Sequence, residues 1–381
     1  IREKNKSILI SYYLKSYYYI SKFLFEKNPT LWDNYYAIGL NNYADYLRKI
    51  GKSTESIKLF KKSLEISETI YNNKEYSMGN VITLNNLAVA FKEMQEINEA
   101  IFLINKALNI IEPLFNNNPS IWALDYALSL NNLSECYYLN NKIDTAITTQ
   151  QTSLEIIEVL FNSDFDMFAE DYTLCLSNLA KYLYYGQRNS EAIYLQEKSV
   201  EITKSLFKKN ENKWGLDYAI SLSNLSSFIR YEDIKAFNFQ EEAINIIEFL
   251  YKNDPDQYIE HYIRAINQLG AIYFSIGAYN ICINIFKDIE RLLNPYYQAD
   301  PKRWSEEYVR NSVNLASSFN KEGKINEEIK NLKKALKALE SLYKEPSKKW
   351  IQHHEIILRS LYSALLKNKR KDEALKNKKK F

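Results

Sequence analysis

Amide side chains recur at one site of this 381-residue chain and are its most distinctive polar feature. Each amide offers a hydrogen-bond donor and an acceptor, so a row of them could pair with the backbone of an extended peptide. An amide could instead bridge neighbouring helices and stabilise the fold without any ligand. Asn is a mediocre residue inside a helix, so its recurrence there requires one of these roles. The amides are Asn42, Asn86, Asn132, Asn178, Asn224, Gln268 and Asn314.

Residue combinations that would support catalysis or metal binding are missing from the sequence. Of three histidines, only His353 and His354 are close together, and adjacent side chains on a helix point about 100° apart, which makes a poor chelate. Glycine-rich phosphate loops, nucleophile elbows and zinc-protease motifs do not occur, and we expect the carboxylates on solvent faces. The sequence therefore predicts no enzyme, no cofactor and no metal site within these residues. Three cysteines are expected to be small core residues: Cys136, Cys175 and Cys282.

Composition limits both the fold and the partner. The chain has only 8 Gly and 7 Pro, too few turn residues for an all-β or α/β protein of this size. The formal charge is +3, but residues 367–381 hold eight Lys/Arg and two Asp/Glu, so the remainder is near −3. A body so close to neutral disfavours nucleic acid as a partner, and we interpret the basic stretch as a solvated helix end. Without a signal peptide or an apolar run of spanning length, and with three cysteines, the chain is expected to be cytoplasmic, reduced and outside the membrane.

An internal repeat places the amides on helices. The segment Leu130-Asn131-Asn132-Leu133-Ser134 has relatives along the whole chain, spaced 44 or 46 residues apart. A constant period in this range indicates a stack of similar supersecondary units. The copies begin at Leu40, Leu84, Leu130, Leu176, Leu222, Ile266, Ser312 and Leu358.

Within one copy, the apolar period predicts two helices. Residues 121–139 place apolar side chains at spacings of three and four, and residues 143–161 form a second such stripe. Between the two stripes, Asn140-Asn141-Lys142 suits the left-handed geometry that ends a helix. At the other junctions, pairs such as Asn118-Pro119 would cap the next helix. We therefore predict sixteen helices in eight hairpins, at about residues 7–49, 54–94, 97–140, 143–186, 189–231, 233–276, 279–321 and 325–367.

Two aromatic series are expected to close the junctions between hairpins. All five tryptophans occupy one site near the start of the first helix, eight residues before the landmark. A bulky pair ends the preceding helix, so we interpret this series as packing rather than as ligand sites. The members are Trp32, Tyr76, Trp122, Phe168, Trp214, Tyr258, Trp304 and Trp350. Four residues later a second series should join the same seam: Tyr36, Tyr126, Tyr172, Tyr218, Tyr262 and Tyr308.

The pattern resembles the tetratricopeptide repeat. Leu130…Leu133-Ser134…Tyr137…Asn141…Ala146 is similar to the family's large–small–aromatic–Gly–Ala order. The usual period is about 34 residues, and the longer period here is similar to kinesin light chain repeats and bacterial arrays. The resemblance covers residues 1–381 and implies one right-handed superhelix, an α-solenoid with a concave groove. The register at both ends predicts that these residues were cut from a longer array.

The resemblance also implies a function. A tetratricopeptide groove binds a peptide or partner protein, so the chain is expected to be a non-catalytic scaffold or sensor module. The seven amides with Tyr138 and Tyr184 are the candidate groove residues, and specificity is expected from neighbouring sites such as Asn85, Asn131 and Asn267. One alternative is the regulatory region of a larger bacterial enzyme or effector, with a caspase-like, TIR or nucleotide-binding domain outside this segment. Another is an RNA-binding helical repeat, which the near-neutral body disfavours.

Overall fold

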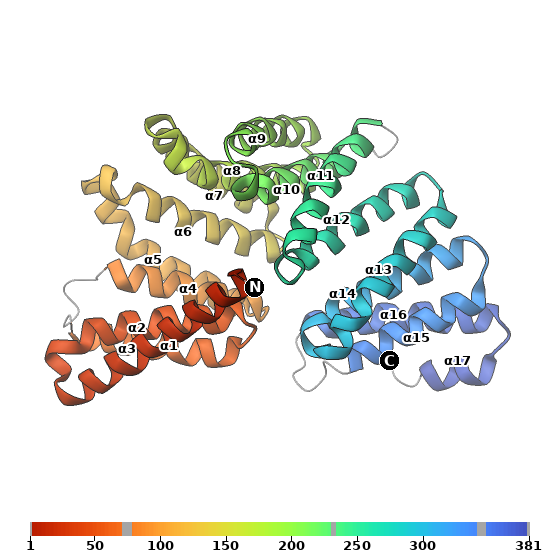
Figure 1. Ribbon diagram of the computed structural model, residues 1–381, viewed down its shortest axis with the longest axis horizontal. Helices are drawn as coiled ribbons and strands as arrows, with labels where there is room; N and C mark the ends of the chain where they lie inside the picture. Colours follow the sequence, from red (N-terminus) through yellow and green to blue (C-terminus); the bar gives the residue numbers. More distant parts are fainter. Residues whose placement is uncertain (1, 71–77, 230–233, 341–347, 379–381) are drawn as a thin grey trace. The chain divides into compact units, whose positions relative to one another are not determined.

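Every element of the described structure is an α-helix (Figure 1). The computed structural model describes residues 2–70, 78–229, 234–340 and 348–378. These segments contain seventeen helices and no strand, so the predicted all-α fold class is confirmed. From α1 to α8, and again from α9 to α17, consecutive helices pack against each other as hairpins, which is the architecture of an α-solenoid.

Two series of helices alternate along the chain. The first helices, which carry the repeated amides, are α2 (Pro29–Lys49), α4 (Met78–Glu93), α6 (Pro119–Leu139), α8 (Phe165–Tyr185), α10 (Glu211–Phe228), α12 (Pro255–Ser275), α14 (Pro301–Lys321) and α16 (Lys348–Lys367). The second helices are α1 (Arg2–Lys27), α3 (Ser53–Ile70), α5 (Ile97–Asn117), α7 (Ile143–Ser163), α9 (Asn189–Lys209), α11 (Ile234–Asn253), α13 (Tyr279–Ala299), α15 (Ile325–Glu340) and α17 (Lys371–Lys378). The sequence predicted sixteen helices, the last ending near residue 367, and α17 follows that predicted hairpin.

The helices form two compact units. Unit 1 is Ile1–Arg188, with α1 to α8, and unit 2 is Asn189–Phe381, with α9 to α17. Each unit has its own buried clusters of apolar side chains. That the repeats make one continuous domain stays a prediction.

Left-handed residues end the first helices, as the sequence predicted. Asn141 has a φ of 57°, and Gly51, Gly277 and Gly323 have φ angles of 78°, 81° and 70°. The same site is left-handed at Gln95, Gln187 and Lys369, where no glycine or asparagine is present. After each turn the chain reverses, because backbone N–H groups there bond to carbonyls of the last helical turn.

Asp and Asn side chains cap the first helices at their other end. The Asp254 carboxylate accepts from the Gln257 N–H at 3.1 Å, and Asp300 accepts from the Arg303 N–H at 3.1 Å. Proline follows each of these aspartates at the first helical position, where the missing N–H loses no hydrogen bond. The predicted cap chemistry is therefore confirmed at these two junctions. It is wrong at Asn28 and Asn118, whose side chains do not cap α2 and α6.

The predicted tyrosine seam is present in six copies. Each tyrosine of the first helix packs on an aromatic ring near the end of the preceding second helix. The pairs, with distances between ring centroids, are Phe25–Tyr36 (4.9 Å), Phe115–Tyr126 (4.7 Å), Phe161–Tyr172 (4.3 Å), Phe207–Tyr218 (5.3 Å), Tyr251–Tyr262 (4.9 Å) and Tyr297–Tyr308 (4.1 Å).

The tryptophan series is part of the packing as well. Trp214 and Trp304 are 7% and 4% exposed, and Trp304 lies 5.1 Å from the Tyr296 ring, between centroids. Trp32 and Trp122 are partly buried. The members Tyr76 and Trp350 fall on side chains outside the described residues.

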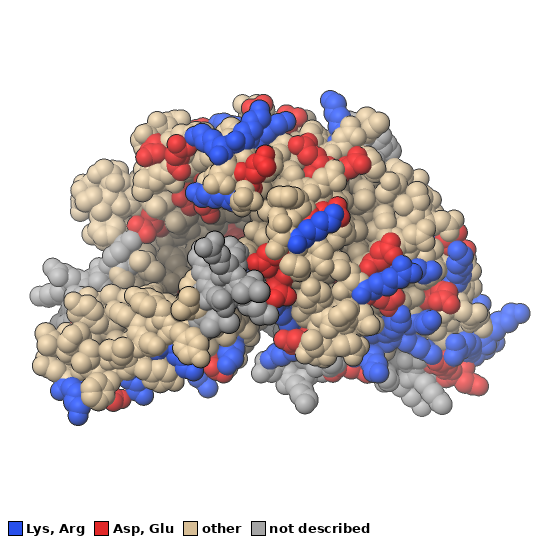
Figure 2. Space-filling model, in the orientation of Figure 1, with Lys and Arg blue, Asp and Glu red and all other residues tan. Residues whose placement is uncertain are grey.

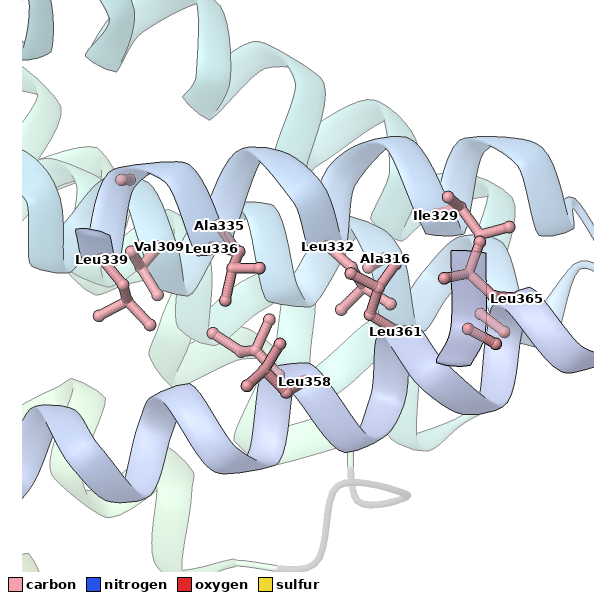
Figure 3. Packing of buried hydrophobic residues seen from close by; sticks show 14 residues of the cluster. Val309, Ala316, Ile329, Leu332, Ala335, Leu336, Leu339, Leu358, Leu361 and Leu365 are labelled. Carbon is pink, nitrogen blue, oxygen red and sulfur yellow. The ribbon is translucent and has the colours of Figure 1, made fainter. Parts of the chain in front are cut away.

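Leucines fill the space between the last hairpins. Leu332, Leu336 and Leu339 of α15 face Leu358 and Leu361 of α16 (Figure 3).

Small residues allow the helices of each hairpin to approach closely. At Gly270, for example, an added Cβ would lie 2.6 Å from the Phe286 ring. The other small residues of this site are buried: Ala44, Ala88, Ser134, Ala180, Ser226 and Ala316.

Candidate partner-binding face

The candidate amides lie on the first helices. We call the surface that carries these amide sites the first-helix face of each unit. In unit 1 they are Asn42 on α2, Asn86 on α4, Asn132 on α6 and Asn178 on α8. In unit 2 they are Asn224 on α10, Gln268 on α12 and Asn314 on α14. Asn42 is exposed, and the other six are partly buried. The helical repeat thus gives all seven amides the same position on successive hairpins.

Four of these amides donate a hydrogen bond to the preceding first helix. Each acceptor is the residue just before the amide site in the previous copy, or that residue's backbone carbonyl. The bonds are Asn86 Nδ2 to Asn41 Oδ1 (3.3 Å), Asn178 Nδ2 to Asn131 Oδ1 (2.9 Å), Asn314 Nδ2 to Asn267 Oδ1 (3.3 Å) and Gln268 Nε2 to the Ser223 carbonyl (2.5 Å). The bridging role considered for the series is therefore realised at these four sites. An amide has two N–H groups and an oxygen, so a ligand could still use the remaining groups.

Asn132 differs from these four amides. It is partly buried on α6, and its side chain has no hydrogen-bond partner in the segments that the structure describes. Its neighbour Asn131 is only 6% exposed and accepts from Gln150 Nε2 at 3.1 Å as well as from Asn178. Of these two adjacent asparagines, Asn131 is structural and Asn132 is open to a ligand.

Several of the residues just before the amides, where specificity was expected, take part in contacts between helices. Asn131 and Asn267 are 6% and 8% exposed, and Asn85 donates to the Ser129 hydroxyl at 2.8 Å. Adjacent residues point about 100° apart around a helix, so when the amide site faces outward its neighbour turns toward the next helix. These side chains hold first helices together.

Tyr138 belongs to a cluster of aromatic and cationic side chains between α6 and α8. Its ring stacks on Tyr182 with centroids 5.0 Å apart and meets the edge of Tyr185 at 5.3 Å. The Lys181 ammonium lies 4.9 Å from the Tyr138 centroid and 5.0 Å from that of Tyr182. We call Tyr138, Lys181, Tyr182 and Tyr185 the tyrosine cluster. Tyr184, the second predicted groove tyrosine, is partly buried with its ring perpendicular to Tyr185.

Burial controls the ionisation of the tyrosine cluster. Desolvation raises the pKa of the Tyr138 and Tyr182 hydroxyls and lowers the pKa of the Lys181 ammonium, while the nearby Glu135 carboxylate acts in the opposite direction on Lys181. Both tyrosines therefore stay neutral at physiological pH and can donate or accept hydrogen bonds. Tyr185 is 60% exposed, so one edge of the cluster is accessible to a partner. The sequence reasoning missed Tyr182 and Tyr185, although both flank Tyr184.

Ion pairs join neighbouring first helices on the same face. Arg48 of α2 pairs with Asp45 at 2.8 Å and with Glu93 of α4, and Lys92 of α4 pairs with Glu135 of α6. Opposite charges are side by side rather than segregated, as the mixed blue and red surface of Figure 2 illustrates.

The expectation that Asp and Glu occupy solvent faces is wrong at two sites. Two carboxylates of unit 2 are buried: Glu307 at 6% and Glu328 at 5% exposed.

A pocket of about 520 Å³ opens between α14 and α16 in unit 2. Val313, Ser317 and Asn320 line it from α14, and Arg359 and Ser360 line it from α16. Ser360 occupies the amide site of the eighth copy, where the shorter side chain leaves room. Glu328 and Leu332 of α15 also contribute to its wall.

A second buried amide series was missed by the sequence analysis. Gln150, Gln196 and Gln240 of the second helices are fully buried. Their Nε2 atoms donate to backbone carbonyls of the following first helix, at Cys175 (3.3 Å), Ser221 (3.1 Å) and Ala265 (2.8 Å). Their spacings of 46 and 44 residues repeat the period and could have revealed them.

Searches for other kinds of site give few candidates. Within the described segments, no helix has the length and apolar character needed to cross a bilayer. The same segments contain no group of three or more His, Cys, Asp or Glu side chains arranged to hold a metal ion. The three cysteines are free thiols in the core, as predicted.

Comparison with known proteins identifies the repeat. Two sequence profiles described as tetratricopeptide repeat match residues 35–112 and 173–210. No curated protein sequence matches the chain. Among solved structures, the apo form of RapI superposes with a TM-score of 0.55 at 14% identity, covering 81% of this chain and 99% of that chain.

Two further structures share the fold. The Rap conjugation gene regulator of the plasmid pLS20, in complex with the Phr* peptide, has a TM-score of 0.55 at 14% identity, covering 84% of this chain and 77% of that chain. A signal transduction ATPase with numerous domains from Pyrococcus horikoshii, which has a tetratricopeptide repeat sensor, has a TM-score of 0.52 at 17% identity, covering 90% and 50%. The repeat register, the matched segments and the helical hairpins agree, so the chain contains tetratricopeptide repeats.

Proposed function

We propose that the chain is a non-catalytic protein-interaction module that holds a peptide, or a segment of a partner protein, against its first-helix face. The observation that carries the proposal is the pairing of an unpartnered amide, Asn132, with the accessible tyrosine cluster on α6 and α8. Tyr138 follows Asn132 by six residues, about 9 Å along the axis of α6 and about 120° around it, and its ring lies against Tyr182 of α8. A segment that bonds to the amide and packs on the rings would therefore cross from α6 toward α8.

The remaining features of the face fit the same role. The four bridging amides and the ion pairs fix the spacing of the first helices, so the face is preorganised for a ligand. One fold neighbour, the pLS20 Rap regulator, was solved with a bound peptide. Three reduced thiols in the core fit a cytoplasmic location.

Selection of random peptides by the immobilised chain, followed by affinity measurement, tests the proposal. Asn132→Ala should weaken a selected peptide by about 2- to 10-fold, the value of one net hydrogen bond. Tyr185→Ala should weaken it by a similar or larger factor, because aromatic side chains dominate interface energies. Tyr194, 66% exposed on the second helix α9, is the matched control, and Tyr194→Ala should leave binding unchanged. Equal losses for Tyr185→Ala and Tyr194→Ala would place the peptide elsewhere and refute the proposal.

A regulatory region of a larger enzyme or effector is the second candidate. It is favoured by the Pyrococcus horikoshii neighbour, of which this fold accounts for only half. The two candidates differ in what adjoins these residues in the full reading frame. A catalytic domain encoded in frame, whose activity changes when the selected peptide is added, would support the regulatory role; unchanged activity would argue against it.

A further inference from the structure

One position of the repeat has a different kind of residue in α15 from that in the other second helices. Near the start of seven of the second helices there is a small, buried residue that faces the other helix of the hairpin. The residues at this site are Ser56, Ala100, Ala146, Ala192, Ala236, Cys282 and Ala374, each 0% exposed. In α15 the corresponding residue is Glu328, which is 5% exposed. A carboxylate thus replaces a methyl-sized side chain at a tightly packed site.

Glu328 has only half of its hydrogen-bonding capacity satisfied. Its Oε1 accepts from Asn320 Nδ2 at 2.6 Å, while its buried Oε2 has no hydrogen-bond partner among the described residues. The other buried carboxylate, Glu307, lies 3.6 Å from Arg264 and 3.2 Å from Arg310, between the charged atoms. A buried charge without a cation is strongly unfavourable. Glu328, in contrast to Glu307, has no ion pair among the described residues.

A pocket beside Glu328 could admit a cation from a partner. Glu328 lines the pocket of about 520 Å³ between α14 and α16, together with apolar Leu332 and Ile357. The pocket lies on the first-helix face, beside Ser360 at the amide site. Two cations of the chain also line the pocket, and neither forms an ion pair with Glu328. The Arg359 guanidinium bonds to Glu355 at 2.5 Å and its side chain is 71% exposed, while Lys321 is exposed at the end of α14.

We propose that this pocket accepts a cationic side chain, arginine or lysine, from the bound peptide and pairs its charge with Glu328 Oε2. The aliphatic stem of such a side chain would lie along Leu332 and Ile357 while its charged head reaches the carboxylate. A guanidinium or ammonium group has several N–H donors and no acceptor, which matches an acidic oxygen that lacks a donor. The inference rests on the proposed function, because the pocket is read as a specificity site of the same peptide-binding face.

Two short peptides test the inference on the full chain: acetyl-Ala-Ala-Arg-Ala-Ala-amide and the same peptide with citrulline, a neutral isostere, in place of arginine. Binding is followed by NMR of methyl-labelled protein, at Leu332, Ile356 and Ile357 of the pocket wall. The arginine peptide should give saturable shifts there, and the citrulline peptide should bind at least tenfold more weakly. A lysine peptide and free n-butylguanidinium separate the kinds of cation, and both are expected to compete with the arginine peptide.

Variants at two adjacent glutamates provide the control. Glu328→Ala restores the residue found at this site in most copies, so the protein should fold and the arginine peptide should lose its shifts. Glu327→Gln removes an exposed carboxylate that pairs with Lys330 at 3.9 Å, and binding should be unchanged. Retained binding in Glu328→Ala, equal binding of the citrulline peptide, or no saturable shift with either peptide would overturn the inference. A selected peptide that still depends on Asn132 and Tyr185 would show that the proposed function survives such a failure.

Discussion

Two adjacent asparagines on α6 should have opposite effects on stability when each is replaced by alanine. Asn131 is buried and its Oδ1 accepts two N–H hydrogen bonds, from Asn178 Nδ2 at 2.9 Å and from Gln150 Nε2 at 3.1 Å, besides a weak one from Cys175 Sγ at 3.9 Å. Asn132 is partly buried and makes no side-chain hydrogen bond to the described residues. Comparing the two alanine variants therefore distinguishes a structural role from a binding role for two asparagines within one turn of α6.

The magnitudes follow from these contacts. Asn131→Ala removes two hydrogen bonds, each worth about 0.5–1.5 kcal/mol net, so the free energy of unfolding should fall by roughly 1–3 kcal/mol. The loss should not be larger, because Gln150 keeps its bond to the Cys175 carbonyl at 3.3 Å and the partly buried Asn178 can turn to water. Asn132→Ala loses no such bond and gains up to about 0.7 kcal/mol of helix propensity. Its stability should be unchanged or slightly raised.

Urea denaturation followed by circular dichroism measures the global effect. Hydrogen exchange of the peptides from α6, α7 and α8 measures the local one, which matters because repeat units open partly independently. Asn131→Ala should lower protection in these three helices, whereas Asn132→Ala should leave it intact and weaken only the peptide. The reasoning would be refuted if Asn132→Ala cost as much stability as Asn131→Ala, or if neither changed protection.

Four further changes test the packing. Trp214→Ala should lower the free energy of unfolding by about 3–5 kcal/mol, because it empties a buried site; an unchanged urea midpoint would contradict this. Gly270→Ala should cost about 1–3 kcal/mol through its clash with the Phe286 ring, and Phe286→Leu should recover part of that loss in the double variant. Gln187→Gly should raise the free energy of unfolding by about 1 kcal/mol, because a φ of 62° strains any side chain with a Cβ; a lower urea midpoint would exclude such strain. Burial raises the pKa of three thiols from 9.0 to about 11: Cys136, Cys175 and Cys282. They should react with Ellman's reagent at about pH 8 only after unfolding, and fast labelling of the native protein would show that they are not buried. The free energy of unfolding should fall as pH rises from 9 toward 11, because the thiols of the unfolded chain ionise first.

Much of the fold could be predicted from the sequence because the determining contacts are local or recur at the repeat period. The stacking of Phe161 on Tyr172, for instance, joins residues eleven positions apart across one capped turn. The left-handed turn at Asn141 and the cap at Asp254 depend on neighbouring backbone groups alone. Such contacts follow from residue type and spacing, whatever the rest of the chain does.

The function of each polar residue could not be predicted in the same way. Asn131 and Asn132 have identical side chains, and which of them turns toward α8 depends on how far each hairpin is rotated from the last. The burial of Glu328 was equally hidden, since a glutamate at the start of a helix normally faces solvent and interacts with the helix dipole. Both answers depend on the packing of neighbouring helices, which hydrophobic periodicity does not specify.

Recurrence itself separates the two kinds of site. A residue type present in nearly every copy, such as the seam tyrosines or the bridging amides, is explained by a contact that every pair of hairpins needs. A partner occupies only some copies, so the residues that recognise it should depart from the repeat. Tyr185 and Glu328 are departures of this kind, because one places an aromatic ring in solvent and the other places a charge at an alanine site. Substitutions at recurring sites that make such a contact should therefore change mainly stability. Substitutions at these two, and at Asn132, whose side chain lacks the contact, should change mainly binding.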